Sequence, residues 1–321
     1  MIEANGLRVV DVLQRGRNAR TGAQESQVSL ILAERPGAST PRSVRTASPI
    51  VDHRRVHATV QRAYAKIALF PRRTHPVSVG RTHALALGYP REALGRLPAL
   101  AVESFCGVAY PVDAMAVRVG DVVVDVGAGS GVDALLAAHL VGPLGQVVGI
   151  ELTEELFRKA ARAAGLAKAT NLRFERGSAE DLPLPGAFAD VVLANGVINL
   201  LVADKDRALA EAWRVLKPGG RIVLADVVVP AAAPLAERAV PERWATDLAG
   251  PVDERELLDL LGEAGFSDVE VRGTSEPFAR TVLAETAPRV GATGVLVVAH
   301  KTRGRHPAAI RDIKEHPTDD E

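Results

Sequence analysis

The sequence predicts an α/β fold, a doubly wound sheet of mostly parallel strands, and two observations support it. β-branched runs alternate with helical segments over residues 122–229, with short connections between them. The first run, Val122–Val126, leads through Gly127, Gly129 and Gly131 directly into a helical segment. Because glycines allow close approach to the backbone and a helix start offers free N–H groups, this unit is typical of a nucleotide-type cradle.

The individual elements follow from hydrophobic runs, caps and breakers. Thr153, followed by Glu154 and Glu155, is typical of a helix start, and Asp204 is expected to begin a later helix. The predicted strands are 122–126, 146–151, 172–176, 190–194, 221–229, 268–272 and 294–299. The predicted helices in this part of the chain are 132–140, 153–168, 204–216 and 254–264.

Four regions are expected along the chain. Residues 1–50 show no sustained period and hold several prolines, which predicts a disordered leader. Residues 51–110 form a helical preface, with one helix from about residue 56 that Pro71 ends and a second at 90–97. Residues 111–300 form the sheet domain. Residues 301–321 are charged and unpatterned, which predicts a loose, disordered tail.

The composition of the chain argues against several classes of protein. Lys plus Arg (39) balances Asp plus Glu (39), so neither a nucleic-acid nor a membrane-surface partner is expected. Cys106 is the only cysteine, which excludes a disulfide framework or a thiolate metal cluster within the chain. Without a membrane-spanning run or a secretory signal pattern, a cytoplasmic protein is expected. The sequence does not indicate the oligomeric state.

The spacing of the glycines bears on the ligand. A dinucleotide fingerprint is Gly-x-Gly-x-x-Gly, whereas here Val132 takes the place of the last glycine. Glu151 ends the second strand about twenty residues later, where a carboxylate can accept hydrogen bonds from both ribose hydroxyls. The turn at 177–182 can present a backbone N–H and an acid, either Glu180 or Asp181, to an adenine edge.

The sequence contains the phrases VVVDVGAGSG, VVGIELTEEL, GSAEDLPLPGAFADVVLANGVINL and WRVLKPGGRIVLADV. Together they resemble the class I S-adenosylmethionine-dependent methyltransferases. Three phrases, NGVINL, LVADKDRALAEAWRVLKPGG and LGYPREALGRLP, resemble within that class the arsenite methyltransferase family. The resemblance covers roughly residues 55–300 and implies a Rossmann-like, seven-stranded sheet whose final strand runs antiparallel. It also implies a cofactor, S-adenosylmethionine, and a set of cofactor-binding residues: Asp125, Gly127, Ala128, Gly129, Gly131, Glu151, Leu152, Ala179, Glu180 and Asn195.

The chain departs from the arsenite methyltransferases at their arsenic-binding cysteines. Gly196 stands where the family has one such cysteine, a second falls near Asp247, and Cys106 is offset from the family's Cys-Gly pair. One thiol cannot build a cage of three thiolates around arsenic. We therefore expect methyl transfer to carbon, oxygen or nitrogen of a small molecule. The alternatives are an arsenite or thiol methyltransferase, or a catalytically silent S-adenosylmethionine-binding domain.

The catalytic residues are not identified by the sequence. His53, His57, Asp247 and Asn199 are candidates for a general base, and many enzymes that transfer methyl groups need only proximity. Tyr64 can either close over the cofactor or belong to the core. His53 and His57 have the i, i+4 spacing of metal ligands, but no further ligand completes a set, so no metal is expected.

Overall fold

The chain divides into two units, residues 1–48 and 49–321. The computed structural model describes residues 8–12, 31–34, 52–201, 205–233, 238, 240–246, 248–279, 281 and 283–302. In the first unit, β1 (Arg8–Val12) pairs antiparallel with β2 (Ile31–Glu34). Regular structure was not expected before residue 50, so that prediction is wrong for these two strands. The rest of the predicted leader lies outside the described residues.

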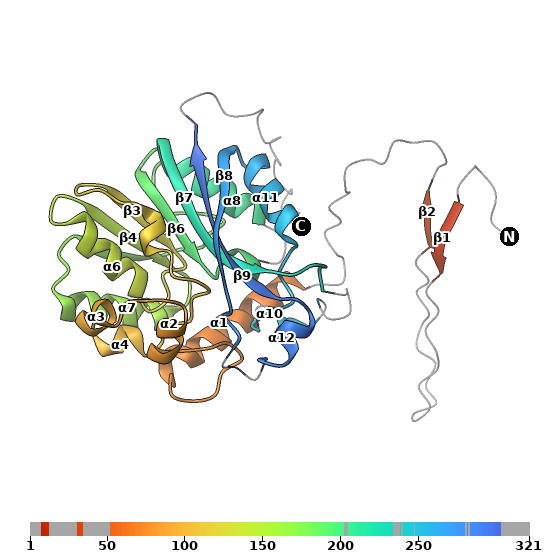
Figure 1. Cartoon of the computed structure of the whole chain (residues 1–321), viewed down its shortest axis with the longest axis horizontal. Helices are drawn as coiled ribbons and strands as arrows, with labels where there is room; N and C mark the ends of the chain where they lie inside the picture. The colour runs from red at the N-terminus through yellow and green to blue at the C-terminus, as the bar shows by residue number, and fades with distance from the viewer. Residues whose placement is uncertain are drawn as a thin grey trace, which may run out of the picture. The chain divides into compact units, whose positions relative to one another are not determined.

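The larger unit contains a seven-stranded sheet in the order β5-β4-β3-β6-β7-β9-β8 (Figure 1). Pairing is parallel from β5 to β7, whereas β9 runs antiparallel to both of its neighbours. The strands are β3 (Val122–Val126), β4 (Gln146–Glu151), β5 (Leu172–Arg176), β6 (Ala189–Asn195), β7 (Leu216–Val228), β8 (Phe266–Ser275) and β9 (Thr293–Lys301). The predicted α/β fold with an antiparallel final strand is confirmed.

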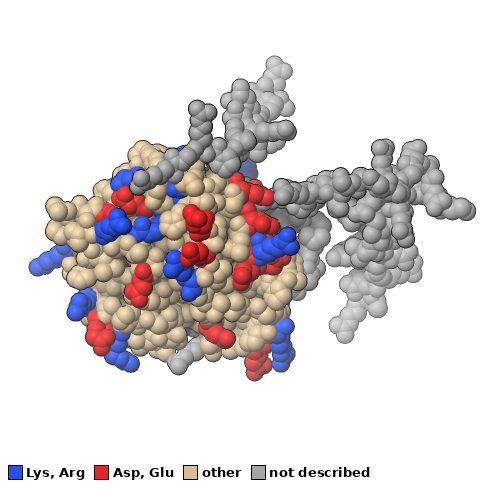
Figure 2. Space-filling view, turned by 45° about the horizontal axis from the view of Figure 1, so that its top comes forward, with Lys and Arg blue, Asp and Glu red and all other residues tan. Residues whose placement is uncertain are grey.

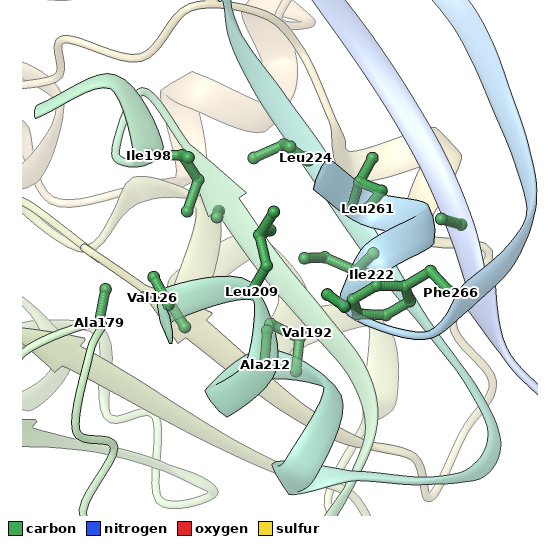
Figure 3. Close-up of a cluster of buried hydrophobic side chains, with 14 of the residues drawn as sticks. Val126, Ala179, Val192, Ile198, Leu209, Ala212, Ile222, Leu224, Leu261 and Phe266 are labelled. Atoms are coloured by element: carbon green, nitrogen blue, oxygen red, sulfur yellow. The ribbon is translucent and has the colours of Figure 1, made fainter. Parts of the chain in front are cut away.

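Alternate residues along the strands point to two separate cores. Val124 and Val126 belong to one hydrophobic cluster, whereas Val123 belongs to another, as the period of two along a strand requires. Helices α6 (Val132–Val141) and α7 (Glu154–Ala167) cover one face of the sheet. Helices α8 (Lys205–Val215) and α11 (Glu254–Glu263) cover the other (Figure 3), with buried contacts from Leu209, Ala212, Leu261, Val192 and Ile222.

The helical preface packs against the face that carries α6 and α7. It begins with α1 (His53–Leu69), which Asp52 caps by accepting a hydrogen bond from the Arg55 N–H (3.0 Å). Four short helices follow: α2 (Arg81–Ala86), α3 (Arg91–Arg96), α4 (Ala99–Val102) and α5 (Val112–Met115). Tyr89, Leu94 and Phe105 bury their side chains in the same cluster as the α6 leucines. The preface and the sheet therefore share one core.

Several boundaries differ from the prediction. Strand β8 extends to Phe266–Ser275 because its pairing with β9 continues across two irregularities, one of them near Asp268 with φ +49°. Strand β7 begins at Leu216, which pairs with Ala189 ahead of the main ladder. Thr153 stands at the start of α7, but its side chain makes no capping hydrogen bond. Asp204 lies outside the described residues.

Lys301 belongs to β9 and not to the predicted tail. Its Nζ donates to the carbonyl oxygens of Trp213 and Leu216 (both 2.7 Å), and it lies 3.7 Å from the centre of the Trp213 ring. These contacts fix the end of β9 against α8 and β7. Residues 303–321, the remainder of the predicted tail, lie outside the described residues.

The remaining short helices are η1 (Ile198–Leu200), α10 (Pro241–Trp244) and α12 (Thr286–Arg289). Among the described residues, no helix combines the length and apolar character that a membrane crossing requires. Basic and acidic side chains are interspersed over the face of the protein in Figure 2. This mixture agrees with the balanced charge of the sequence.

Candidate active site

A cavity lies at the carboxyl ends of β3, β4 and β6 and has an empty volume of about 990 Å³, part of it open to solvent. The sheet order turns in opposite directions from β3, toward β4 and toward β6, and open α/β sheets bind ligands at such a point. Two walls line the cavity. We define the sheet-side wall as its lining residues within 125–133, 150–156 and 177–179, with Asn195. The cap-side wall consists of its lining residues within 57–64, 104–107 and 196–201.

The glycine turn after β3 follows a path that only glycine adopts easily. Gly127 has φ +67° and Gly129 has φ +56°. A Cβ at Gly127 would collide with the side chain of Val197 across the cavity. A Cβ at Gly129 would meet only open space, apart from the Gly127 carbonyl oxygen at 3.9 Å. Gly129 therefore leaves its backbone open to a ligand, and Gly127 allows the two walls to approach each other.

Gly131 has a different role. It does not line the cavity, and it stands at the start of α6 with φ +87°. A Cβ there would lie 2.8 Å from the Phe174 ring and 3.3 Å from Ala160. The structure thus gives Gly131 a packing role between α6, α7 and β5, while its predicted contact with the cofactor stays untested.

Glu151 ends β4 and is buried against the glycine turn. Its Oε2 accepts a hydrogen bond from the Gly129 N–H (2.8 Å), and its Oε1 accepts one from the Thr153 N–H (2.7 Å). Burial raises the pKa of Glu151, and these backbone hydrogen bonds lower it in part. The carboxylate oxygens are therefore fixed in position, with lone pairs left for further donors.

Two more carboxyl groups are buried in the sheet-side wall. Burial raises the pKa of Asp133 to about 6, and hydrogen bonds from Tyr89 and Asn195 oppose the shift. Burial, and then the charges of Asp133 and Glu151, raise the pKa of Asp125 well above its usual value. Three carboxyl groups in one desolvated wall repel each other, so the wall is suited to a cationic ligand.

Asn195, at the end of β6, ties the sheet-side wall to residues 108–109, which directly follow the 104–107 segment of the cap-side wall. Its Oδ1 accepts hydrogen bonds from the N–H groups of Val108 (2.7 Å) and Ala109 (3.3 Å). Its Nδ2 donates to Asp133 Oδ2 (2.9 Å) and to the Ala109 carbonyl oxygen (3.0 Å). Asp133 Oδ1 in turn accepts a hydrogen bond from the Tyr89 hydroxyl (2.6 Å). Asn195 lines the cavity, and these bonds connect the sheet edge to the preface.

The segment that carries Cys106 is held on both sides by further hydrogen bonds. Nε2 of the buried His83 lies 2.7 Å from the Gly107 carbonyl oxygen, and the Ser275 hydroxyl donates to the Val108 carbonyl oxygen (2.7 Å). A Cβ at Gly107 would lie 2.6 Å from Asn195 Nδ2, so this position requires glycine. The segment is therefore a fixed part of the cap-side wall.

The turn after β5 supplies the far end of the sheet-side wall. Ala179 and Ser178 line the cavity, as does Leu152 beyond β4. Glu180, predicted to meet adenine, does not line it, and its carboxylate accepts a hydrogen bond from the Ser178 hydroxyl. Of the ten predicted cofactor residues, eight line the cavity: Asp125, Gly127, Ala128, Gly129, Glu151, Leu152, Ala179 and Asn195.

The candidates for a general base are separated by the structure. His57 lines the cavity from α1, whereas His53 and Asn199 do not. Tyr64, predicted either to close over the cofactor or to belong to the core, also lines the cavity. The buried Asn199 donates to Asp226 Oδ1 (2.7 Å), which gives it a structural partner. Asp247 lies outside the described residues.

Sequence reasoning missed Asp133 and Tyr89. Both are buried, and both belong to the network around Asn195. The position of Asp133, directly after the glycine turn and in the first turn of α6, is the signal that could have indicated it. Tyr89 offers no comparable local signal, because its partners are distant in the sequence.

The antiparallel final strand, the glycine turn after β3 and the acid at the end of β4 together define the class I methyltransferase fold. Comparison with known proteins identifies the family. The chain belongs to the S-adenosylmethionine-dependent methyltransferases, and residues 118–265 match a family described as a methyltransferase domain.

Two curated relatives illustrate the range of this family. The chain is 36% identical over 170 residues to the arsenite methyltransferase of Halobacterium salinarum, which covers 53% of this chain and 43% of that protein. It is 31% identical over 184 residues to the ubiquinone/menaquinone biosynthesis C-methyltransferase of Serratia proteamaculans, covering 50% of this chain and 72% of that protein. The chain thus matches less than half the length of the arsenite methyltransferase.

Solved structures agree with the family assignment. The arsenic(III) S-adenosylmethionine methyltransferase of Chlamydomonas reinhardtii superposes with a TM-score of 0.52 at 30% identity, covering 73% of this chain and 77% of that one. The phosphoethanolamine N-methyltransferase 2 of Haemonchus contortus, solved with S-adenosylmethionine, gives a TM-score of 0.51 at 16% identity. It covers 69% of this chain and 60% of that one, and it supports the fold alone.

The residues of the sheet-side wall fit S-adenosylmethionine. The backbone at Gly129 is open to the cavity, and the Glu151 carboxylate beside it can accept hydroxyl donors. Among the described residues, no Lys or Arg forms an ion pair with Asp125, Asp133 or Glu151. A ligand that carries an ammonium and a sulfonium group would supply the missing positive charge.

Proposed function

We propose that the protein transfers the methyl group of S-adenosylmethionine to a small-molecule acceptor held between the two walls of the cavity. One observation carries the proposal. A single cavity is lined by the predicted cofactor residues on one side and by a mixture of apolar and polar side chains without Lys, Arg, Asp or Glu on the other. Such a cavity can bring a methyl donor and an acceptor together and exclude water.

The cofactor, when bound, supplies an electrophilic methyl group on a sulfonium sulfur. The protein contributes by positioning the methyl donor and the acceptor relative to each other. Glu151 would hold the ribose, the open backbone at Gly129 would lie against the methionine part, and Ala179 would meet the adenine. Asn195 fixes the segment that faces them, and the apolar side chains of Leu200 and Leu201, which line the cavity, would limit the access of water to the reaction.

An acceptor that must lose a proton needs a base on the cap-side wall. The exposed His57 and the half-buried Tyr64, both on α1, are the titratable groups of this wall besides Cys106. Histidine is the residue that most often acts as a general base in enzymes. The sequence leaves open whether any base is used, and we assign none.

Thiol or metalloid methylation is the second candidate, because Cys106 lines the cavity. Relatives named arsenite methyltransferases add weight to it. The chain has one cysteine, however, and Gly196 in the cap-side wall occupies a position where that family has another. A single thiolate provides a much weaker hold on trivalent arsenic than three.

Calorimetry of S-adenosylmethionine binding tests the cofactor site. Glu151→Ala should weaken binding by roughly 2–4 kcal/mol, since it removes charge-assisted hydrogen bonds to the ribose. Glu180→Ala is the matched control, because Glu180 does not line the cavity, and its effect should be within about threefold in Kd. Equal affinity for the wild type and the Glu151 variant would refute the ribose assignment.

A screen with labelled S-adenosylmethionine and a metabolite library, including arsenite with excess thiol, tests the reaction. We expect label on carbon, oxygen or nitrogen of a small molecule. Label on arsenic would overturn the argument from the missing cysteines. Tight cofactor binding without any label would indicate the silent binding domain. The absence of a nucleic-acid partner stays a prediction, supported by the balanced charge, and the cytoplasmic location also stays a prediction.

A further inference from the structure

The two walls of the cavity differ in their charge. The sheet-side wall contains the carboxyl groups of Asp125, Asp133 and Glu151. The described residues of the cap-side wall include no Lys, Arg, Asp or Glu. Their polar groups are neutral or weakly basic: His57, Gln61, Tyr64, Ser104 and Cys106. An acceptor in this cavity therefore faces acids on one side and finds no fixed cation on the other.

Two buried lysines lie close behind the cavity, and each is engaged elsewhere. Lys159 Nζ donates to the Ala68 carbonyl oxygen (2.9 Å) and to the Ser104 hydroxyl (2.7 Å), and forms an ion pair with Glu103 (2.9 Å). Lys205 Nζ donates to two backbone carbonyl oxygens beside the cap-side wall, those of Ile198 (2.8 Å) and Leu201 (3.0 Å). Neither lysine lines the cavity.

We propose that the acceptor is an uncharged molecule with an apolar body, and that the charge pattern of the cavity excludes anionic acceptors. This inference rests on the proposed function. A carboxylate or phosphate would lose its hydration against the cap-side wall, whose described residues offer it no lysine or arginine as a counter-ion. A cationic acceptor would have to bring its charge close to the sulfonium group of the cofactor. A neutral apolar acceptor avoids both penalties.

The test uses three phenols of similar size whose side chains differ in charge. They are 4-propylphenol, tyramine and 3-(4-hydroxyphenyl)propionate, with neutral, cationic and anionic tails. Binding to the full chain loaded with S-adenosylhomocysteine is measured by ligand-observed NMR. The neutral probe should bind at least roughly tenfold more tightly than the anionic one. Equal or tighter binding of the anion would overturn the proposal.

A positive charge introduced into the cap-side wall should change the relative affinities of the neutral and anionic probes. Gln61→Arg places a guanidinium on the cavity face of α1, and the anionic probe should gain about fivefold or more relative to the neutral one. Leu69→Arg is the control, since Leu69 is on the same helix, is 58% exposed and does not line the cavity. If both arginine variants raise the affinity for the anionic probe equally, the selectivity does not arise in the cavity and the proposal fails.

Turnover provides a measurement that needs no chosen probe. A metabolite extract is separated on an anion exchanger at pH 7, and each fraction is incubated with the protein and labelled S-adenosylmethionine. Label should appear in the unretained fraction, and label confined to the retained anions would overturn the inference. Cofactor binding without label in any fraction would instead refute the proposed methyl transfer, so the two failures are distinguishable.

Discussion

The two walls of the cavity are built in opposite ways. On the sheet side, polar groups are buried and fixed by hydrogen bonds. Glu151 accepts hydrogen bonds from two backbone N–H groups, and Asp133 accepts hydrogen bonds from Tyr89 and Asn195. On the cap side, apolar side chains and neutral polar groups come from three separate segments. The first arrangement suits one defined, charged ligand, whereas the second fixes little beyond shape and the absence of charge. Cofactor identity and acceptor identity are therefore encoded differently.

The largest expected effect comes from the point where the walls touch. Gly127→Ala forces a residue with a side chain into φ +67° and drives its Cβ into Val197. We expect the free energy of unfolding to fall by about 2–4 kcal/mol, from backbone strain and overpacking together. Denaturant unfolding measures it. Adding Val197→Ala should recover part of the loss, and no recovery would show that the walls do not press on each other there.

A second prediction concerns the amide that connects the walls. Asn195→Asp places a carboxylate beside Asp133, only 2.9 Å from the present amide nitrogen. The cost should be about 2–3 kcal/mol near pH 8, since two buried like charges lose a hydrogen bond and gain repulsion. The cost should shrink at pH 5, where one carboxyl group is protonated. The exchanged pair, Asn195→Asp with Asp133→Asn, should regain stability, and failure to do so would argue against this pairing.

The buried acids also predict opposite pH dependences for stability and binding. Since the pKa of Asp133 is raised from 3.8 to about 6 in the fold, its neutral form favours folding. The free energy of unfolding of the cofactor-free protein should therefore fall as pH rises from about 4 to 6. A cationic cofactor prefers the ionised acid, so its affinity should rise roughly tenfold from pH 5 to pH 7. Chemical unfolding and calorimetry check the two trends, and parallel trends would refute the argument.

The smallest change in cofactor affinity is expected from a substitution in the cap-side wall. Leu200→Ala removes an apolar side chain that lines the cavity but belongs to no polar network. Cofactor affinity should stay within about threefold, while turnover of the acceptor falls because the acceptor is held less firmly. Binding and labelled methyl transfer are measured on the same sample. A large loss of cofactor affinity would remove the distinction between the walls.

The difference between the walls also explains what the sequence could predict. Most of the sheet-side wall lies within residues 125–156, where strand, glycine turn and acid follow each other locally. Those residues were predicted, and the alternation of strands and helices predicted the fold. Gly131 was predicted in the right turn, but the structure gives it a packing role that depends on Phe174, about forty residues away.

The cap-side wall could not be predicted in the same way. Its residues come from α1, from the segment near Cys106 and from η1, and only tertiary assembly brings them together. Tyr89 and Asn195, likewise, share a hydrogen bond of 3.3 Å across 106 positions. No local pattern indicates such a pair, so the network between the walls became visible only in three dimensions.

The strand order has a consequence for how the protein is made. Strand β9 lies between β7 and β8, although it is synthesised after both. While a ribosome extends the chain, the parallel strands around the glycine turn can already pair, but β7 presents an open edge until β9 arrives. β8 likewise has no sheet neighbour at that stage. The nascent chain therefore passes through an aggregation-sensitive interval, which closes only when residues 293–301 emerge.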